Sequence, residues 1–354
     1  MRSTSVREVN MELYFLDENF QIIDGPIDEV LSAVWEERFF DIGTFRLVFP
    51  RSMFTRAERA RYVSARAESV KWLSGRVEYV SAAEDGECEV RGRLLEVLLD
   101  DVIMRGGEVY SGKFTDVLRD ILQSNITHTP VVLADDFCTI EDEVEIKTSW
   151  KSLGEWLRTI LKPRGASFCV DLIRGVPTIS IIVGRDRSSE SEDGSPRALF
   201  STSYGNIGGV EYERDVSEMK NFLYICGSEG RIVTVDKSEG GPRREIYRKA
   251  DGTSPDGFEN DEEYISALVR AGEEMLSEYT EAVCVFAECE AASGLVYGVD
   301  YALGDICDVA DAELGLSFSL RITGAATVFE DGECKVYPTF GDEIELIKNL
   351  RSAE

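Results

Sequence analysis

Residues 11–50 read MELYFLDENFQIIDGPIDEVLSAVWEERFFDIGTFRLVFP, and this stretch sets the expected fold of the N-terminal part of the chain. Its apolar runs at 13–15 and 20–23 flank the polar turn Asp17-Glu18-Asn19, which is typical of a β-hairpin. In the run TFRLVFP, at 44–50, large apolar residues recur at every second position, as in a strand with one buried face. We therefore expect the chain to begin with β-strands.

The same period of two continues further along the chain. Val77 and Tyr79 precede a turn at 84–86, and Cys88 and Val90 follow it. Short strands at this spacing are typical of a small barrel or sandwich. A β-rich first domain is the expected result.

After Gly92 the period lengthens to that of helices, and strands follow before an acidic loop, SSESEDGS, at 188–195. Pro163 is expected to end the last helix of this block. The pattern predicts helices at 94–103, 114–122 and 150–161, and strands at 166–172 and 177–183.

The C-terminal part returns to strands. The turn-rich residues 237–258 predict a long exposed hairpin or insertion, and Asn260 with Glu263 forms a capping pair for a helix running to Met275. The order of strands, mixed block and strands predicts an α+β protein with two β modules. Strands are predicted at 283–289, 305–311, 316–329 and 333–338.

The composition excludes several classes of function. The 354 residues carry a net charge of -29, which argues against a protein that grips nucleic-acid phosphates or anionic lipid. A single histidine, His128, excludes sites built from several imidazoles, and its loop position favours an exposed residue over a base. No apolar run approaches the ~18 residues of a membrane span, and the N-terminus has no apolar core of signal-peptide length.

The eight cysteines favour a chain that matures in a reducing compartment. None forms a C-x-x-C pair, and most lie alone in apolar runs, which disfavours a zinc site and predicts half-buried thiols. The expected localisation during synthesis is the cytoplasm.

No motif points to catalysis or a cofactor. The P-loop, G-x-S-x-G, H-E-x-x-H and EF-hand patterns are all missing, and GNIGG at 205–209 lacks dinucleotide spacing. A carboxylate pair for glycoside hydrolysis stays open, because the chain has 67 acidic residues. Calcium held by Asp251, Asp256 and Glu259 is a further alternative. We expect neither metal nor cofactor, and no enzyme activity.

One segment is basic within this acidic chain. Residues 51–76 hold seven basic residues against Glu58 and Glu68. Two interpretations stay open: a basic face balanced within one subunit, or a patch that meets acids on a neighbouring copy. The basic residues are Arg51, Arg56, Arg59, Arg61, Arg66, Lys71 and Arg76.

Four stretches in order resemble the tail-hub proteins of siphophages and related prophages, the ReqiPepy-type tail proteins of the phage baseplate-hub superfamily. The first is the opening hairpin with its aromatic-rich run, and the second has the pattern G-R-x-L-x-x-L-L followed by a helix. The third begins with GRDR and the fourth with LGDICDV. The stretches are 11–50, 90–122, 184–227 and 303–343.

The resemblance implies two tail-tube-like β-barrel domains with peripheral α/β domains. The first barrel would be 1–108, and the discontinuous second barrel 203–231 with 293–346. The peripheral part would be 109–202 with 232–292, followed by a short tail at 347–354. Three copies would form a ring of six similar modules, able to match a sixfold tail tube to a threefold tip.

The resemblance also implies a structural role at the virion tail tip. The expected partners are two further copies, a distal tail or tail-tube protein, a downstream tip or receptor-binding protein, and the tape-measure protein. DNA would pass without specific binding, and no membrane is involved. Acids lining the bore would repel phosphates, or the charge would serve solubility alone. The chain ends soon after the closing strand, so we expect wall-degrading activity to reside in another polypeptide.

Two rival functions stay open at this point. One is a cell-wall-degrading tail enzyme with a carboxylate pair, and the other is the hub of a contractile injection or tailocin particle. Within the GRDR run, Arg185, Asp186 and Arg187 are candidates either for a subunit contact or for bracing the turn into the acidic loop, and bracing is favoured because arginine forks commonly pin loops.

Overall fold

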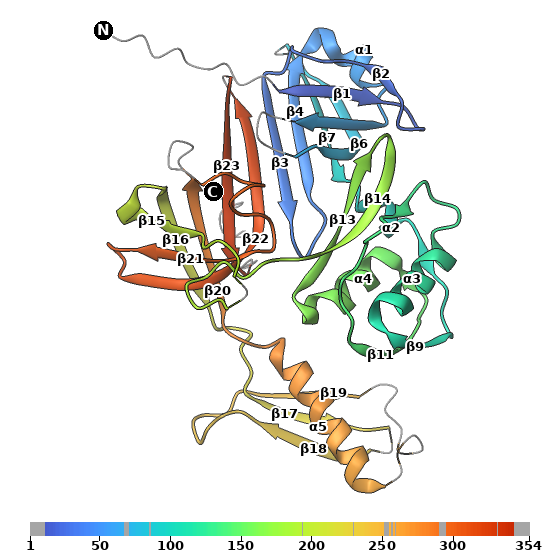
Figure 1. The fold of residues 1–354 in the computed structure, drawn as a ribbon, viewed down its shortest axis with the longest axis vertical. Helices are drawn as coiled ribbons and strands as arrows, with labels where there is room; N and C mark the ends of the chain where they lie inside the picture. The colour runs from blue at the N-terminus through green and yellow to red at the C-terminus, as the bar shows by residue number, and fades with distance from the viewer. Residues whose placement is uncertain are drawn as a thin grey trace. The chain divides into compact units, whose positions relative to one another are not determined.

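The computed structural model describes most of the chain, and strands dominate it (Figure 1). The described residues fall into two compact units, one within 11–211 and 286–341 and one within 212–285 with Asp342. None of the described helices is long and apolar enough to span a membrane. The described ranges are 11–66, 71–84, 86–192, 194–228, 230–250, 255, 258, 260–289, 295–330 and 332–342.

A single 13-stranded sheet contains both β-rich parts of the chain. The N-terminal strands form what we call the first module, with the short helices η1 (Arg51–Met53) and α1 (Phe54–Ala57). Its strands are β1 (Glu12–Leu16), β2 (Ile22–Asp24), β3 (Ser32–Arg38), β4 (Thr44–Pro50), β5 (Tyr62–Arg66), β6 (Leu73–Ala82) and β7 (Glu87–Leu94).

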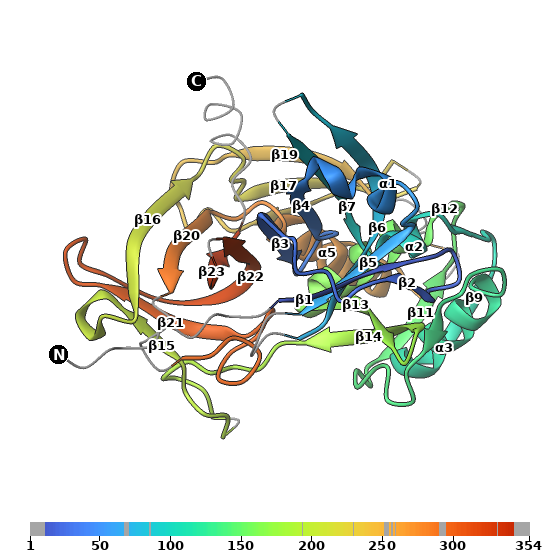
Figure 2. The ribbon, with the colours of Figure 1, turned by 90° about the horizontal axis from the view of Figure 1, so that it is seen from above.

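The C-terminal strands form the second module, which contains the short helix η3 (Thr202–Tyr204). Figure 2 shows β16, β20 and β21 of this module curving around one side of β22 and β23. Its strands are β15 (Leu199–Ser201), β16 (Ile207–Asp215), β20 (Ala282–Cys289), β21 (Ile306–Asp311), β22 (Leu316–Glu330) and β23 (Glu333–Gly341).

The two modules repeat one strand order. The sheet runs β3-β4-β7-β6-β5-β1 in the first module and β16-β20-β23-β22-β21-β15 in the second. In each module one long strand has two partners. The first part of β6 pairs with β5 and the rest with β7, and the first part of β22 pairs with β21 and the rest with β23. One difference is that β1 and β5 are antiparallel, whereas β15 and β21 are parallel.

The modules join edge to edge inside the chain. Residues Gly324 to Glu330 of β22 pair antiparallel with Arg38 to Ser32 of β3. Among the described strands the result is one open sheet without a closed barrel, so the two predicted β-barrel domains are not confirmed. The physical reason is that the edges of β22 and β3 hydrogen-bond to each other, so neither strand closes a barrel within its own module.

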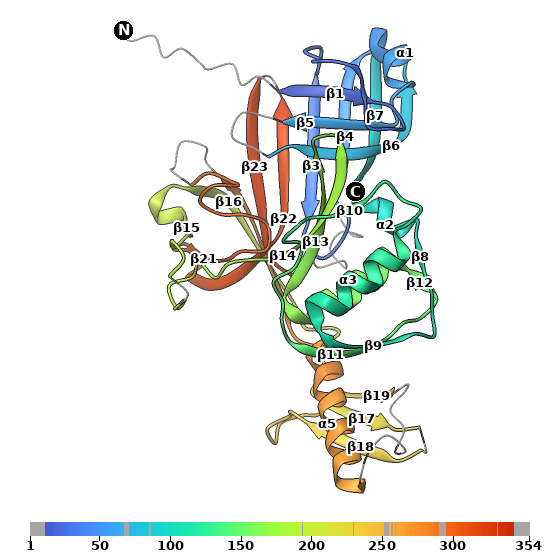
Figure 3. The ribbon, with the colours of Figure 1, turned by 45° about the vertical axis from the view of Figure 1, so that its right-hand side comes forward.

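The core of the first module lies between its sheet and the strands that fold back over it. In Figures 1 and 3, β1 crosses the direction of β3 and β4. Trp35 stacks on Phe45 with centroids 5.0 Å apart, and Phe15 meets Phe49 edge-on at 5.6 Å. These residues belong to one buried cluster, whereas Arg46 and Arg91 on the other face of the sheet are exposed.

The middle of the chain packs helices against a hairpin. Apolar residues of α3 and α4 share one buried cluster with Phe168 of β13, and Ser152 caps α4 by accepting a hydrogen bond from the Glu155 N–H. The elements are α2 (Val97–Asp100), β8 (Ile103–Met104), β9 (Val109–Lys113), α3 (Phe114–Asn125), β10 (Val132–Leu133), β11 (Glu143–Lys147), β12 (Lys151–Ser152), α4 (Leu153–Leu161), η2 (Lys162–Arg164), β13 (Ala166–Ile173) and β14 (Val176–Val183).

Two helix predictions in this block are wrong in extent. The expected helix at 94–103 is only the single turn α2, because Leu94 ends β7 in the first-module core while Leu98 packs into the next core. The third helix begins at Leu153, and Trp150 lies before it with 72% of its surface exposed. The predicted α3 and the strands β13 and β14 are confirmed.

The unit of 212–285 is a three-stranded sheet covered by one helix. It consists of β17 (Phe222–Cys226), β18 (Ile232–Asp236), β19 (Glu245–Lys249) and α5 (Asp261–Ser277), in the strand order β18-β17-β19. Asn260 caps α5 as predicted, because its Oδ1 accepts a hydrogen bond from the Glu263 N–H at 2.9 Å. The residues 237–258, predicted as an exposed hairpin or insertion, contribute β19, which pairs in parallel with β17.

These elements divide differently from the predicted domain boundaries. The segment 203–231 contributes β16 to the large sheet and β17 to the small one, because Leu223 and Ile225 pack under α5. The segment 232–292 ends in β20, a strand of the large sheet. The predicted tail at 347–354 lies outside the described residues.

Candidate functional site

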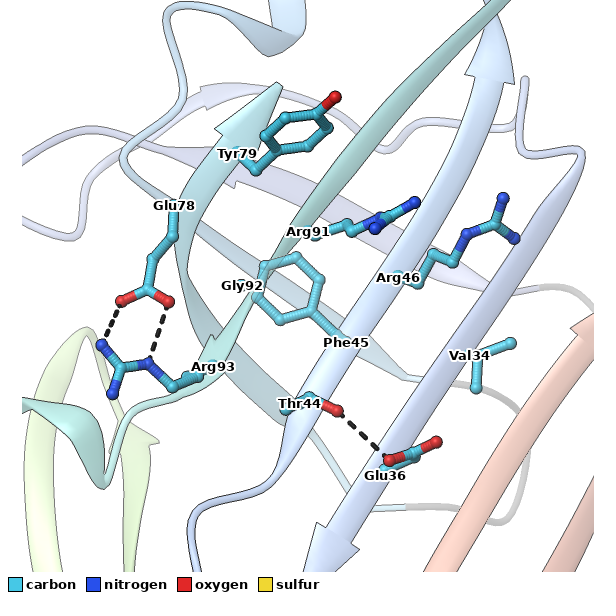
Figure 4. Close-up of a pocket in the computed structure, with 10 residues that line it drawn as sticks. All are labelled: Val34, Glu36, Thr44, Phe45, Arg46, Glu78, Tyr79, Arg91, Gly92 and Arg93. Carbon is cyan, nitrogen blue, oxygen red and sulfur yellow. Dashed lines mark hydrogen bonds and ion pairs between the residues drawn. The ribbon is translucent and has the colours of Figure 1, made fainter. Parts of the chain in front are cut away.

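A shallow polar groove lies on the uncovered face of the first module. Its volume is about 510 Å³, and Figure 4 shows its side chains rising from β3, β4, β6 and β7. Alternation explains the charged side chains, because inward residues of these strands fill the core and the outward ones are left for the groove. Phe45 belongs to the core cluster and lines the groove as well. The lining residues are Val34, Glu36, Thr44, Phe45, Arg46, Glu78, Tyr79, Arg91, Gly92 and Arg93.

Two glutamates hold the arginines of this groove in place. Arg93 donates from Nε and Nη2 to the two oxygens of Glu78 at 2.9 and 2.8 Å, as Figure 4 shows. Arg91 donates in the same way to Glu89, at 2.8 Å for both bonds. Each glutamate therefore meets one guanidinium through a two-bond fork, the strongest geometry for such a pair.

Each glutamate also binds a second arginine. Arg76 donates to Glu78 from Nη2 at 2.8 Å and also pairs with Asp101, and Arg46 pairs with Glu89. The hydrogen bond from Arg93 lowers the pKa of Glu78. Burial opposes the same shift at Glu89, but hydrogen bonds from Arg91 and Arg46 lower its pKa. Both carboxylates therefore stay charged at neutral pH.

The predicted basic segment is only partly engaged within the chain. Arg56 binds Asp24 through two hydrogen bonds, and Arg66 pairs with Glu12 at 3.2 Å. Arg61 donates to backbone carbonyls, while Arg51 and Arg59 are exposed. These five arginines lie on or beside η1, α1 and β5, outside the groove. Their contact with a neighbouring subunit stays a prediction.

The GRDR run lies against the second module. Arg187 is 5% exposed and donates from Nε to Asp305 Oδ2 at 2.6 Å, and the Arg185 N–H donates to Oδ1 at 2.8 Å. Arg187 also donates to the Pro196 carbonyl beyond the acidic loop, at 3.2 Å. Asp186 accepts from the Ser188 N–H. Arg187 thus pins this loop from inside the subunit, whereas the Arg185 side chain is exposed.

A charged cluster around the buried Glu37 escaped the sequence analysis. Lys71 Nζ lies 2.7 Å from Oε1 of Glu37, which is 3% exposed, and the Tyr297 hydroxyl donates to Glu37 Oε2 at 2.9 Å. Burial alone would lower the pKa of Lys71, but Glu37 and Asp171 raise it well above its ordinary value. The cluster joins the first module to the segment before β21. Its members lie more than thirty residues apart in sequence, so no local pattern marks them.

Glu96 gives the fold a pH-dependent stability. Its Oε1 accepts from the Val170 N–H at 3.3 Å, and its Oε2 is buried with no hydrogen-bond partner among the described residues. Burial raises the pKa of Glu96 to about 7. The unfolded group titrates near 4.3, so the folded state binds more protons between these values and the free energy of unfolding falls as pH rises through them.

We expect Glu96→Gln to remove this slope. Between pH 4 and pH 8 the native chain should lose up to about 3 kcal/mol through Glu96, and the variant should not. Urea unfolding at several pH values measures the difference, with the exposed Glu262→Gln as control. A variant with the same slope as the native chain contradicts the assignment.

No group of three or more metal-ligating side chains lies together among the described residues. Burial raises the pKa of the Cys289 thiol to about 11 and that of Cys307 to about 12, so both are protonated at neutral pH and poor nucleophiles. The acids considered for calcium, Asp251, Asp256 and Glu259, lie outside the described residues.

Three solved structures with a similar fold are described as tail proteins. The tail protein from Neisseria meningitidis matches with a TM-score of 0.65, covering 95% of this chain and 97% of its own. The 43 kDa tail protein of prophage MuSo2 from Shewanella oneidensis matches at 0.62, with 93% and 97% covered. Prophage tail protein gp18 from Listeria monocytogenes matches at 0.57, with 96% and 97% covered. Each is 12% identical to this chain, so the likeness concerns the fold.

The sequence comparison identifies the family directly. No curated protein matches the chain. The family model described as Siphovirus ReqiPepy6 Gp37-like protein matches residues 10–342, which is nearly all of the sequence and includes both modules. The chain therefore belongs to the siphovirus ReqiPepy6 Gp37-like family of phage tail proteins.

Proposed function

We propose that this component of the virion tail is the hub of the tail tip, a ring of three copies that joins a sixfold tail tube to a threefold tip and lets DNA pass. The observation that carries the proposal is the repeated strand order of the two modules. A chain with two like modules presents six like units in a trimer, which is what a threefold ring needs to meet a sixfold tube.

The strand pairing that joins the two modules within one chain indicates how neighbouring copies would pair. The longest strand of the second module, β22, pairs antiparallel with β3, which stands at the end of the first module's strand order. In the repeated strand order, β6 of the first module corresponds to β22, and β16 of the second module corresponds to β3. The second half of β6 pairs on one side with β7, and β16 ends the sheet beside β20. We infer that β6 of one copy pairs with β16 of the next.

This pairing would close the open sheet. An unpaired strand edge invites another strand, and a heterologous contact whose rotation closes makes a ring. Six repeats of one junction, three within chains and three between them, would form a continuous cylinder. The predicted barrels would then be a property of the assembly, in which each module supplies part of one wall.

The remaining roles follow from this position. The ring acts without catalysis, metal or cofactor, and it contacts a distal tail or tail-tube protein, a tip or receptor-binding protein and the tape-measure protein. It is assembled in the host cytoplasm and ends at the virion tail tip. The exposed Arg51 and Arg59 would face acids of a neighbouring copy, because the chain as a whole is strongly acidic.

Proline substitutions in β16 test the pairing between copies. Consecutive N–H groups of a strand point to opposite sides, and proline is tolerated on an edge strand where its N–H would face solvent. Of Val210→Pro and Glu211→Pro, one removes a hydrogen bond to β20 and the other removes a donor from the side of β16 that faces away from β20. We expect the variant that keeps its hydrogen bonds to β20 and loses only the outward donor to fold and remain monomeric.

The measurement is native mass spectrometry of chains assembled with the distal tail protein. The native chain should give three times 39.5 kDa, and the edge variant a monomer with unchanged circular dichroism. Trimers from both proline variants, or a native chain that stays monomeric under all assembly conditions, would count against the ring.

A further inference from the structure

We propose that the uncovered groove face of the first module lines the DNA channel, and that Glu78 and Glu89 neutralise its arginines so that duplex DNA slides past without binding. The inference rests on the proposed function, because it needs a hub through which DNA passes. It assigns a contact surface and a mode of contact to a face that would otherwise be only the solvent side of a sheet.

Three arginines of this face are more exposed than the glutamates that they bind. The side chains of Arg46, Arg91 and Arg93 are 48%, 55% and 42% exposed, whereas those of Glu89 and Glu78 are 17% and 29% exposed. At these pairs an approaching polyanion would therefore meet the guanidinium groups before Glu78 and Glu89. Glu36, with 45% of its side chain exposed, adds one further carboxylate to the groove.

The donors that would grip a phosphate are already in use. Arginine binds phosphate through a fork of two parallel N–H groups. In Arg91 and in Arg93, Nε and Nη2 both donate to a glutamate, so a phosphate would have to displace a charged two-bond partner. The fork geometry that normally captures phosphates is satisfied internally at both residues.

The charges of this network nearly cancel. Four arginines share two glutamates, and Arg76 also pairs with Asp101, which leaves about one positive charge. An uncompensated arginine face would hold DNA by releasing its counterions, and a purely acidic face would repel it. A balanced face does neither, which suits a polyanion that must pass quickly. The acids predicted to line the bore are thus replaced here by paired charges.

The test is to remove the two carboxylates. Glu78→Gln with Glu89→Gln frees the guanidinium groups, and we expect duplex DNA to bind the purified chain at least tenfold more tightly at about 50 mM salt, with an affinity that falls steeply as salt rises. The native chain should show no retention. The matched control is Glu262→Gln with Glu273→Gln on α5, which makes the same change in net charge and should not bind.

A further variant keeps the result interpretable. Adding Arg91→Gln and Arg93→Gln to the first pair should abolish the DNA binding that the pair creates. Binding that persists in this fourfold variant, or no gain over the α5 control in the first, overturns the proposal. Capture of a polyglutamate peptide by the native chain would also overturn it, and would assign the groove to an acidic protein segment.

Assembled particles separate this inference from the proposed function. Tails that carry the Glu78 and Glu89 replacements should form normal trimers by mass and release DNA more slowly than native tails. Normal trimers with native release rates contradict the channel-facing groove while leaving the hub intact. A failure of native chains to form trimers contradicts the hub itself.

Discussion

Asp305→Ala is expected to lower the free energy of unfolding by about 3–5 kcal/mol, because it leaves a buried arginine without its counter-charge. Asp305 is 3% exposed, and it accepts from Arg187 Nε at 2.6 Å, from the Arg185 N–H at 2.8 Å and from the Ala302 N–H at 3.0 Å. The substitution removes both acceptor oxygens and with them all three hydrogen bonds.

Urea unfolding of the native and substituted chains measures this loss. The matched control is Arg185→Ala in the same run, which removes an exposed side chain and keeps the backbone N–H that Asp305 binds. Its expected cost is below about 0.5 kcal/mol. Equal losses for the two variants would show that the Arg187–Asp305 pair does not hold the GRDR run to the second module.

Gly92→Ala is the second change with a large expected effect, a loss of about 3 kcal/mol. A Cβ at this position would overlap the carbonyl oxygen of Arg76 and come within 2.8 Å of the Phe45 ring. Phe45 is 3% exposed and stacks on Trp35, so it has no room to withdraw. The added methyl group must therefore push β6 away from β7.

The position of Gly92 ties this prediction to the groove. Gly92 pairs with Val77 beside the register shift that precedes Tyr79, and Arg93 follows it directly. Thermal unfolding measures the loss, and Gly208→Ala serves as control because a Cβ there would meet nothing within 4 Å. A Gly92 variant as stable as the control would contradict the close approach of β6, β7 and Phe45.

Local periodicity was enough to locate most elements. Helix α3 and its buried face follow from the 3.6-residue spacing of Phe114 to Leu122, and the cap of α5 follows from Asn260 and Glu263. The same reasoning failed at 94–103, where the apolar run serves two cores and therefore imitates one helical face. The spacing of apolar residues indicates that they are buried, but it does not indicate which core covers each of them.

The groove network was beyond the reach of sequence reasoning. Glu78 meets Arg93 across 15 residues, and Arg46 meets Glu89 across 43. Such pairs depend on which strands become neighbours, and no local signal records that. The basic segment was visible as a charge excess, yet Arg76 binds in the groove network while Arg56 and Arg66 bind acids elsewhere.

The edge-to-edge joining of the modules was missed for a related reason. Each module has the short alternating strands of a barrel, and the sequence says nothing of whether a strand edge closes its own module or meets another. The pairing of β22 with β3 settles this within the chain. The resemblance to tail hubs implied two like modules, and the structure has two modules with the same strand order.

A cryo-electron reconstruction of the tail end tests the hub most directly, because it shows the number of copies and the partner of every strand edge. We expect three copies in a closed ring, with β6 of each copy hydrogen-bonded antiparallel to β16 of the next. A different copy number, or a β6 edge that faces solvent in the assembled tail, would contradict the account.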